Sequence, residues 1–252
     1  MRLAVHWAGV AGHPVVVLLH GLFGSARNLG GLRRALAGSF QVAAIDLRNH
    51  GDSPHGEGMA YAAMTDDVRQ TLQSEGVTSA CVVGHSMGGK VAMTLALHAP
   101  AMVERLVVAD IAPVTYPSHF GAYVAAMLTV RATSSRAQAD AALAGAIPDA
   151  AIRSFLLHNF RSGTGWRIGL DEIAAALPEV EIWDSTDATP FARPTLFVTG
   201  ARSDYVKAGD RPAITALFPA ASFAEIPDAG HWLHAEQPDA FNRRVAAFLS
   251  AA

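Results

Sequence analysis

The chain has 252 residues, of which 51% are hydrophobic and 16% are charged. This length suits one large α/β domain, and so apolar a composition can build a sizeable core. The formal net charge of −3, with 11 histidines counted as neutral, provides no broad basic surface, which argues against nucleic acid or an anionic membrane as a partner. We therefore expect a soluble protein that acts on a small molecule.

The N-terminal residues and the cysteine content indicate a cytoplasmic location. Cys81 is the single cysteine, so no internal disulfide can form. The first seven residues contain neither an apolar signal segment nor a small-residue cleavage site. The apolar run at 15–19 is much too short to span a bilayer. We predict a cytoplasmic protein without a membrane partner, present as a monomer or a homodimer.

The first half of the chain alternates strands with helices. Continuous β-branched runs are typical of parallel strands that are covered on both faces, and helices of amphipathic or Ala-rich pattern separate these runs. The predicted strands are 3–7, 15–19, 41–45, 80–83 and 103–109, and the predicted helices are 25–37, 61–74 and 87–98.

The alternation stops at Pro113 and resumes near 194. Between them the pattern is helical, without a convincing strand, over the segments 120–130, 135–144, 150–160 and 170–176. The last part returns to strands at 194–200 and 221–226 and to helices at 207–217 and 238–250. We predict an α/β fold in which a mostly parallel, doubly wound sheet has helices on both faces. Residues 1–112 and 188–252 would form this core domain, and residues 113–187 an inserted helical cap.

The most informative stretch is Gly84-His85-Ser86-Met87-Gly88, which joins the strand at 80–83 to the helix at 87–98. A Gly-x-Ser-x-Gly sequence between a strand and a helix is typical of a nucleophile on a sharp, strained turn. Glycines at 84 and 88 would relieve crowding against the neighbouring strand and helix. Ser86 is thus the candidate nucleophile.

A serine hydroxyl needs a neighbouring base, because it holds its proton tightly at neutral pH. His231 follows the last predicted strand, which places it at the same carboxyl edge of the sheet as Ser86. We predict that His231 is this base and that His234 lies nearby. A metal site built on these two histidines lacks further ligands, so we expect neither a metal nor another cofactor.

Four motifs together resemble the α/β-hydrolase fold superfamily. They are His20-Gly21-x-x-Gly24, Asp46-x-Arg48-x-His50-Gly51-x-Ser53, Gly84-x-Ser86-x-Gly88-Gly89 and Asp228-x-Gly230-His231. The second of these, with Gly200-Ala201-Arg202-Ser203, resembles the branch of small single-domain serine carboxylesterases with a short helical cap.

The resemblance leaves two candidates for the acid that orients His231. In most α/β hydrolases the acid lies three residues after a glycine, a position that Ser203 occupies here with Asp204 beside it. The esterase branch implies Asp110 instead, at the end of the strand at 103–109. Both loops end at the same edge of the sheet. We favour Asp110, keep Asp204 as the alternative, and expect Ser203 to add a supporting hydrogen bond.

The fold family also implies an oxyanion hole made of backbone N–H groups. We expect one donor from Met87, directly after the nucleophile, and the other from Leu22, with Phe23 as the alternative. His20, His50 and Asp46 are expected to fix these loops through hydrogen bonds.

The implied activity is that of a serine carboxylesterase acting on small acyl or aromatic esters through an acyl-enzyme. The residues expected to line the substrate site are Phe23, Met127, Phe155, Trp166 and Trp232. A thioesterase, a lactonase, a carbon-carbon bond hydrolase or a perhydrolase would use the same serine and histidine, and a slow hydrolase-like receptor is a further alternative.

Overall fold

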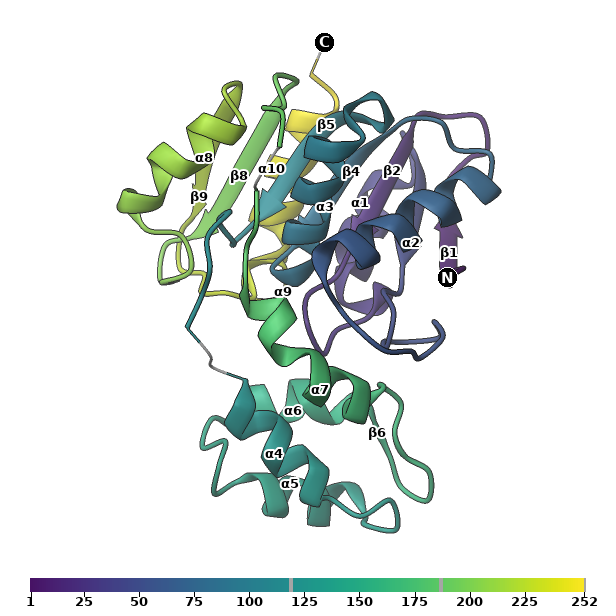
Figure 1. Ribbon diagram of the computed structural model, residues 1–252, viewed down its shortest axis with the longest axis vertical. Coiled ribbons are helices and arrows are strands. Elements are labelled where there is room, and N and C mark those ends of the chain that lie inside the picture. The colour runs from purple at the N-terminus through teal and green to yellow at the C-terminus, as the bar shows by residue number, and fades with distance from the viewer. Residues whose placement is uncertain (118–119, 186–187, 252) are drawn as a thin grey trace.

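A seven-stranded sheet forms the centre of the computed structural model, which describes residues 1–117, 120–185 and 188–251 (Figure 1). The first strand pairs antiparallel to its neighbour, and every other pairing in this sheet is parallel. In spatial order the strands are β1 (Val5–Ala8), β3 (Gln41–Ile45), β2 (Val15–Leu19), β4 (Ala80–His85), β5 (Val103–Ala109), β8 (Thr195–Gly200) and β9 (Ala221–Ile226).

Helices cover both faces of the sheet, as predicted. Val17 and Leu19 of β2 belong to one buried cluster, whereas Val16 and Leu18 belong to another. This alternation follows from the two-residue period of a strand. The first cluster packs under α2 (Tyr61–Ser74), α3 (Met87–His98) and α8 (Arg211–Leu217), and the second under α1 (Gly30–Leu36), α9 (Leu233–Glu236) and α10 (Pro238–Leu249).

The order of these elements agrees closely with the sequence pattern. The helices at 61–74 and 87–98 and the strands at 103–109 and 221–226 have the predicted bounds. Three 3₁₀ turns, at Ala26–Leu29, Pro100–Met102 and Ala208–Asp210, precede α1, β5 and α8. The short α9 was not predicted.

Four helices form a separate layer beyond the carboxyl ends of the strands, at the bottom of Figure 1. They are α4 (Gly121–Thr129), α5 (Arg136–Leu143), α6 (Ala150–Leu157) and α7 (Leu170–Glu181). This layer occupies the predicted cap segment. Asp187, the last residue of that segment, lies outside the described residues, so the boundaries at 112/113 and 187/188 stay a prediction.

The expectation that the cap contains no strand is wrong. Phe160–Arg161 and Gly165–Trp166 pair as a short antiparallel hairpin, β6 and β7, so the helix predicted over 150–160 ends at Leu157. Gly163 and Gly165 have φ values of +91° and +84°, which glycine adopts without a steric penalty. The turn signal lies in Ser162-Gly163-Thr164-Gly165, and the pattern of apolar residues before it masked the strand.

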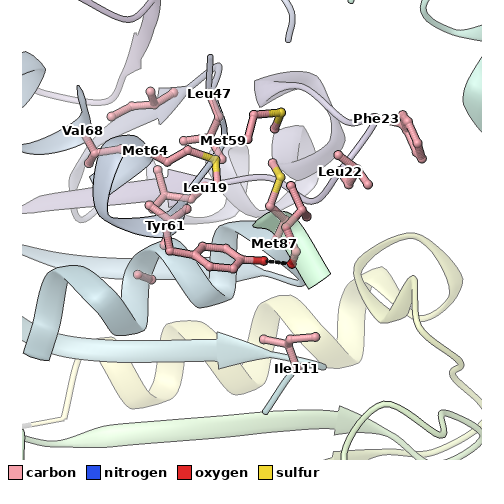
Figure 2. Close-up of a cluster of buried hydrophobic side chains, with 14 of the residues drawn as sticks. Leu19, Leu22, Phe23, Leu47, Met59, Tyr61, Met64, Val68, Met87 and Ile111 are labelled. Carbon is pink, nitrogen blue, oxygen red and sulfur yellow. Dashed lines mark hydrogen bonds between the residues drawn. The ribbon is translucent and has the colours of Figure 1, made fainter. Parts of the chain in front are cut away.

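One contact of the cap with the core runs through Tyr61. Its ring lies in the buried cluster formed by Met64, Leu19 and their neighbours, and its hydroxyl donates a 2.5 Å hydrogen bond to the carbonyl oxygen of Val180 at the end of α7 (Figure 2). Burial raises the pKa of Tyr61, so the hydroxyl keeps its proton and acts as the donor.

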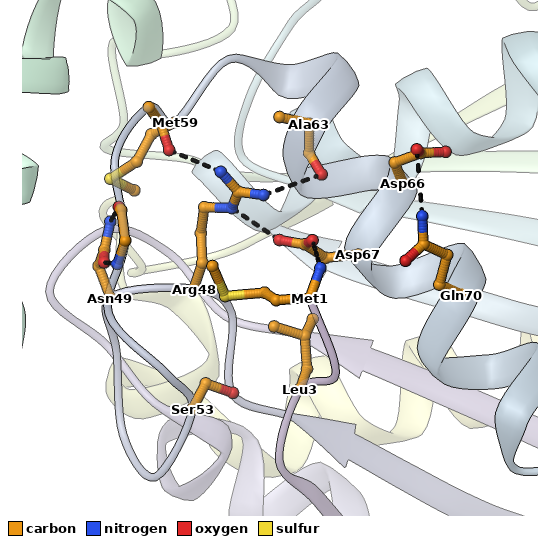
Figure 3. A network of polar contacts seen from close by, with 12 residues as sticks. Met1, Leu3, Arg48, Asn49, Ser53, Met59, Ala63, Asp66, Asp67 and Gln70 are labelled. Carbon is orange, nitrogen blue, oxygen red and sulfur yellow. Dashed lines mark hydrogen bonds and ion pairs between the residues drawn. The ribbon is translucent and has the colours of Figure 1, made fainter.

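A buried ion pair anchors the loop after β3. Arg48 Nε donates to Asp67 Oδ2 on α2 over 2.6 Å, and its Nη1 donates to the carbonyl oxygen of Gly58 over 2.9 Å (Figure 3). The amino group of Met1 also pairs with Asp67. Arg48 thus holds the loop that contains His50 against α2.

No helix in the described part of the chain is long and apolar enough to cross a membrane. The cytoplasmic location stays a prediction from the sequence.

Candidate active site

Ser86 lies on the sharp turn between β4 and α3, with a φ of +53°. The two flanking glycines are required by close packing, as predicted. A Cβ on Gly84 would lie 2.2 Å from the carbonyl oxygen of Gly88, and a Cβ on Gly88 would lie 2.5 Å from the carbonyl oxygens of Leu19 and His20. The turn therefore places the Ser86 side chain at the carboxyl edge of the sheet, where it is 8% exposed.

The hydroxyl of Ser86 is 3.0 Å from Nε2 of His231. His231 comes from the loop between β9 and α9, 145 residues further along the chain. The two side chains thus meet at hydrogen-bond distance, the geometry that proton removal from the hydroxyl requires.

Asp110 contacts the other ring nitrogen of His231. Its Oδ2 is 2.7 Å from His231 Nδ1 and also accepts a hydrogen bond from the Ser203 hydroxyl, while its Oδ1 accepts from the Gly200 N–H over 3.0 Å. Asp110 is 0% exposed and has a φ of +54°, whereas Asp204 is exposed. The structure thus brings Asp110, and not Asp204, to His231, with Ser203 beside it.

The loop after β2 supplies backbone N–H groups beside the cavity above Ser86. The Phe23 N–H donates to Nε2 of His50 over 3.1 Å and is therefore already used. No partner of the Leu22 N–H is found among the described residues, and Leu22 lines the cavity above Ser86. Met87 is the first residue of α3, and the first N–H groups of a helix lack intrahelical acceptors. Leu22 and Met87 are thus the available pair.

His20 and His50 hold this loop as neutral rings. Nδ1 of His20 donates to the carbonyl oxygen of Gly21 over 2.8 Å, and its Nε2 accepts from the Leu47 N–H over 3.0 Å. Nδ1 of His50 donates to the carbonyl oxygen of Arg48 over 2.8 Å. Burial lowers the pKa of His20, and it lowers that of His50 to about 3. Both rings therefore keep one acceptor nitrogen at neutral pH, which confirms their expected structural role.

His85 packs against His231, and His234 packs against His85. His85 Nε2 donates to the carbonyl oxygen of His231 over 2.8 Å, and the ring of His85 lies 4.5 Å from that of His234. Burial and the neighbouring imidazoles lower the pKa of His85 well below its usual value and that of His234 to about 4. Both are neutral near pH 7, so His85 holds the backbone of His231 without adding charge.

A cavity of about 350 Å³ opens above Ser86. Phe23, Phe155 and Trp232 line it, as predicted, and so do cap residues Phe120 and Tyr123. The other lining residues are Gly21, Leu22, Gly24, Asn28, His85, Ser86, Ile152, Leu156, Tyr205, His231 and His234. Most of this wall is apolar, which suits a small organic ligand.

The structure contradicts the prediction that Met127 and Trp166 line this cavity. Met127 is fully buried, and its carbonyl oxygen accepts from the indole N–H of Trp166 over 3.0 Å. The Trp166 ring packs edge-on against Phe160, with centroids 5.2 Å apart. Both residues therefore hold the cap together, because apolar side chains at helical spacing usually pack inside their own layer.

Three residues near Ser86 were not predicted. The ring of Tyr205 stacks on that of His231 at 3.7 Å, Asn159 Nδ2 donates to the carbonyl oxygen of Phe23 over 2.6 Å, and Lys90 is buried one helical turn after Ser86. Only Lys90 has a signal in the sequence, because a lysine is out of place on so apolar a helix. The other two depend on loop and cap placement.

One group of side chains has the composition of a metal site. His6, Asp46 and Asp52 offer ligand atoms within 4.8 Å of one another. Asp46 already accepts hydrogen bonds from the N–H groups of Ala26 and Asp52 and pairs with His6. These bonds account for the cluster as loop fixation, the role expected for Asp46.

Comparison with known proteins agrees with this fold. A family model described as alpha/beta hydrolase fold matches residues 14–238. The chain belongs to the α/β-hydrolase fold family. A solved structure described as a marine microorganism esterase shares this family fold with a TM-score of 0.94 and 35% identity, over 98% of this chain and 99% of that chain.

Several curated relatives match almost the whole chain. The sn-1-specific diacylglycerol lipase ABHD11 of Mus musculus is 42% identical over 255 residues, which are 96% of this chain and 83% of the mouse protein. Esterase YbfF of Escherichia coli strain K12 is 37% identical over 240 residues, which are 93% of this chain and 92% of that protein. These names support the prediction of an ester hydrolase.

Proposed function

We propose that this protein is a serine carboxylesterase whose catalytic residues are Ser86, His231 and Asp110. The observation that carries the proposal is the continuous chain of contacts from the Ser86 hydroxyl through the His231 ring to the buried Asp110 carboxylate. Ser86 and His231, the two members of this series that reach the surface, lie at the floor of a largely apolar cavity, which is where an ester would bind.

In the first half of the reaction the ester acylates Ser86. Nε2 of His231 takes the hydroxyl proton as Oγ attacks the carbonyl carbon, and the carbonyl oxygen becomes an oxyanion held by the N–H groups of Leu22 and Met87. The tetrahedral intermediate then collapses. His231 gives its proton to the leaving oxygen, so the alcohol departs and the acyl group stays on Oγ.

In the second half water releases the acid. His231 takes a proton from a water molecule, whose oxygen attacks the acyl carbon, and the same two N–H groups hold the second oxyanion. His231 then returns the proton to Oγ of Ser86, and the carboxylic acid leaves. No cofactor takes part in either half.

Asp110 orients the base. By accepting from Nδ1–H of His231, it keeps Nε2 unprotonated and facing Ser86, and its charge stabilises the imidazolium that forms. Ser203 and the Gly200 N–H, which both donate to Asp110, keep the carboxylate in place. Ser203 is therefore a positioning residue.

The proposed substrates are esters of small acyl or aromatic groups. The cavity of about 350 Å³ is near the lower end of the range for small-molecule sites. A mouse relative is named a diacylglycerol lipase, and the apolar walls are compatible with a glyceride. The volume favours shorter acyl chains for this protein.

Labelling with a fluorophosphonate, together with turnover of 4-nitrophenyl butyrate, tests this function. We expect one label on Ser86, and we expect Ser86→Ala to abolish both labelling and turnover. Ser154→Ala, on the exposed side of α6, is the control and should retain both. Labelling without turnover would instead indicate a slow hydrolase-like receptor.

A further inference from the structure

A second hollow, of about 30 Å³, extends from Ser86 along α3. It shares Leu22, Ser86, Phe120 and Tyr205 with the main cavity. Beyond these residues its walls include Tyr61, Met87, Lys90, Ile111, Tyr116 and Glu181. We call this hollow the Lys90 slot. The slot has room for a small group only, since a single water molecule occupies about 10–15 Å³ on a comparable measure.

The ammonium group of Lys90 lies at the inner end of the slot. Lys90 is 2% exposed, and its Nζ lies 4.9 Å from the ring centre of Tyr116 and 5.3 Å from that of Tyr61. Both tyrosines line the slot, as does Glu181. Because the same residues surround Nζ and bound the slot, a group that enters from Ser86 approaches Nζ.

The ammonium group of Lys90 can donate a further, shorter hydrogen bond. Its Nζ is 3.3 Å from the carbonyl oxygen of Glu181 and 3.5 Å from that of Ile182, which is longer than the usual N–H···O distance of about 2.9 Å. An ammonium group has three donors, and burying a charge with such weak partners is unfavourable. A closer oxygen acceptor in the slot would therefore be bound well.

The position of His231 decides which half of an ester enters the slot. The leaving oxygen must take its proton from Nε2 of His231, so the alcohol half lies on the side of His231. His231 lines the main cavity, whereas among the described residues the slot is lined by Met87 and Lys90 and not by His231. The alcohol half thus occupies the main cavity, and the acyl half points along α3 into the slot.

Glu181 decides what charge the acyl group can carry. Its negative charge favours the charged form of Lys90 and partly offsets the burial that lowers the pKa of Lys90 to about 8. Its Oε1 is buried and has no hydrogen-bond partner among the described residues. A second carboxylate in the slot would meet the negative charge of Glu181 as well as the ammonium of Lys90, whereas an uncharged oxygen can accept from Lys90 without that repulsion between two full charges.

We propose that Lys90 is a substrate-binding residue that selects short acyl groups with an uncharged oxygen, a ketone or a hydroxyl, near their far end. This inference rests on the proposed esterase function. Lys90 follows Ser86, the residue that precedes α3, by four positions, about 6 Å along the helix axis, so the oxygen must lie within a few carbon atoms of the reacting carbonyl.

Three 4-nitrophenyl esters of nearly equal length test the proposal. They are the pentanoate, the 4-oxopentanoate and the hydrogen succinate, which place a methylene, a ketone and a carboxylate at the same position. The spontaneous hydrolysis of each ester is measured without enzyme and subtracted before kcat/KM is calculated, because the free carboxylate of the succinate attacks its own ester. We expect the 4-oxopentanoate to exceed the pentanoate by about tenfold or more, since a hydrogen bond to a charged donor is at stake, and to exceed the succinate as well.

Variants at the two lysines of the chain separate selection from general effects. In Lys90→Met the preference for 4-oxopentanoate over pentanoate should fall below about twofold, and Lys90→Gln, which keeps a donor, should retain part of it. Lys207→Met, at an exposed position, should keep the full preference. Glu181→Gln should raise the relative rate of the succinate, because the repelling charge is gone. Each ratio compares two substrates of one variant, so it does not depend on the folded fraction.

Several outcomes would overturn the proposal. They are a wild-type preference below about twofold, an unchanged preference in both Lys90 variants, and a succinate that is the best of the three esters. Turnover of the pentanoate with such a result would leave the esterase function intact. Failure to hydrolyse any of the three esters, with no label on Ser86, would instead reject the proposed function itself.

Discussion

The backbone N–H of Phe23 donates to Nε2 of His50 over 3.1 Å. This bond joins the loop after β2 to the loop after β3, and it occupies the donor that was the alternative to Leu22 in the oxyanion hole. Since Nδ1 of His50 donates to Arg48, protonation of Nε2 would break the bond. The geometry of the site therefore depends on a neutral His50.

Acid should destabilise the protein through its buried histidines. The pKa of His50 is lowered to about 3 and that of His234 to about 4, whereas both titrate near 6.5 in the unfolded chain. Below pH 6.5 the unfolded state binds protons that the native state excludes, so stability is lost as the pH falls toward these folded values. Each histidine should contribute about 1.4 kcal/mol per pH unit to the free energy of unfolding, as measured by urea unfolding between pH 7.5 and 4.5.

His50→Gln should reduce the pH dependence of the unfolding free energy by the uptake of about one proton. His13→Gln, at an exposed position, is the control and should leave it unchanged. Equal pH dependence in the two variants would contradict the lowered pKa of His50.

Asp110→Asn should lower kcat by about four orders of magnitude, the size of effect seen when the orienting acid of a serine protease is replaced by an amide. The amide would donate to Nδ1 and so hold His231 in the wrong tautomer. Asp204→Asn is the matched control and should change kcat less than about twofold, because Asp204 is exposed. Steady-state hydrolysis of 4-nitrophenyl butyrate measures both, and the reverse ranking would assign the role to Asp204.

Asn159→Ala should weaken the link between the cap and the loop after β2, which contains Leu22 and Phe23. Its Nδ2 donates to the carbonyl oxygen of Phe23 over 2.6 Å, and without this bond the Leu22 N–H loses part of its fixed position. We expect kcat to fall about tenfold, which corresponds to about 1.4 kcal/mol of transition-state stabilisation, with little change in KM. Asn242→Ala on α10 is the control; an equal loss of kcat there would point to a general effect on folding.

The hydrolysis rate should fall as the acyl chain lengthens from butyrate to palmitate. The cavity holds about 350 Å³, and Phe155 and Trp232 close one side with ring centres 5.7 Å apart. Phe155→Ala should raise the rate on 4-nitrophenyl palmitate relative to butyrate, whereas Leu128→Ala, exposed on the same cap, should leave the ratio unchanged. Fastest turnover of palmitate by the unmodified protein would refute the size argument.

Gly88→Ala should unfold the protein or destabilise it by more than about 3 kcal/mol, since backbone overlap on this scale is beyond ordinary overpacking. The new Cβ would lie 2.5 Å from the carbonyl oxygens of Leu19, the last residue of β2, and of His20, and neither backbone can move without opening the site. Gly38→Ala, where no atom lies within 4 Å of the added Cβ, should be neutral. Thermal unfolding of both variants makes the comparison.

Local pattern was sufficient for the sheet, the helices that cover it and the nucleophile turn. Burial and backbone sterics within about twenty residues determine the apolar strand β4, the glycines at 84 and 88 and the Ala-rich helix α3. These features can therefore be predicted from residues that are close together in the sequence. The cap was harder to predict, because its hairpin and its inward-facing residues depend on which helix faces the core.

The proposed acid, the proposed oxyanion donor and the Lys90 slot all depend on tertiary structure. Asp110 and Asp204 both follow strands that end at the same edge, and only the backbone turn at Asp110, with a φ of +54°, aims its carboxylate at His231. Likewise Phe23 and Leu22 are adjacent in the chain, and only the contact with His50 separates their roles. Sequence predicts which groups follow a strand and so lie at this end of the sheet, because where each strand ends is a local property. The direction of each side chain depends on contacts between segments up to 146 residues apart.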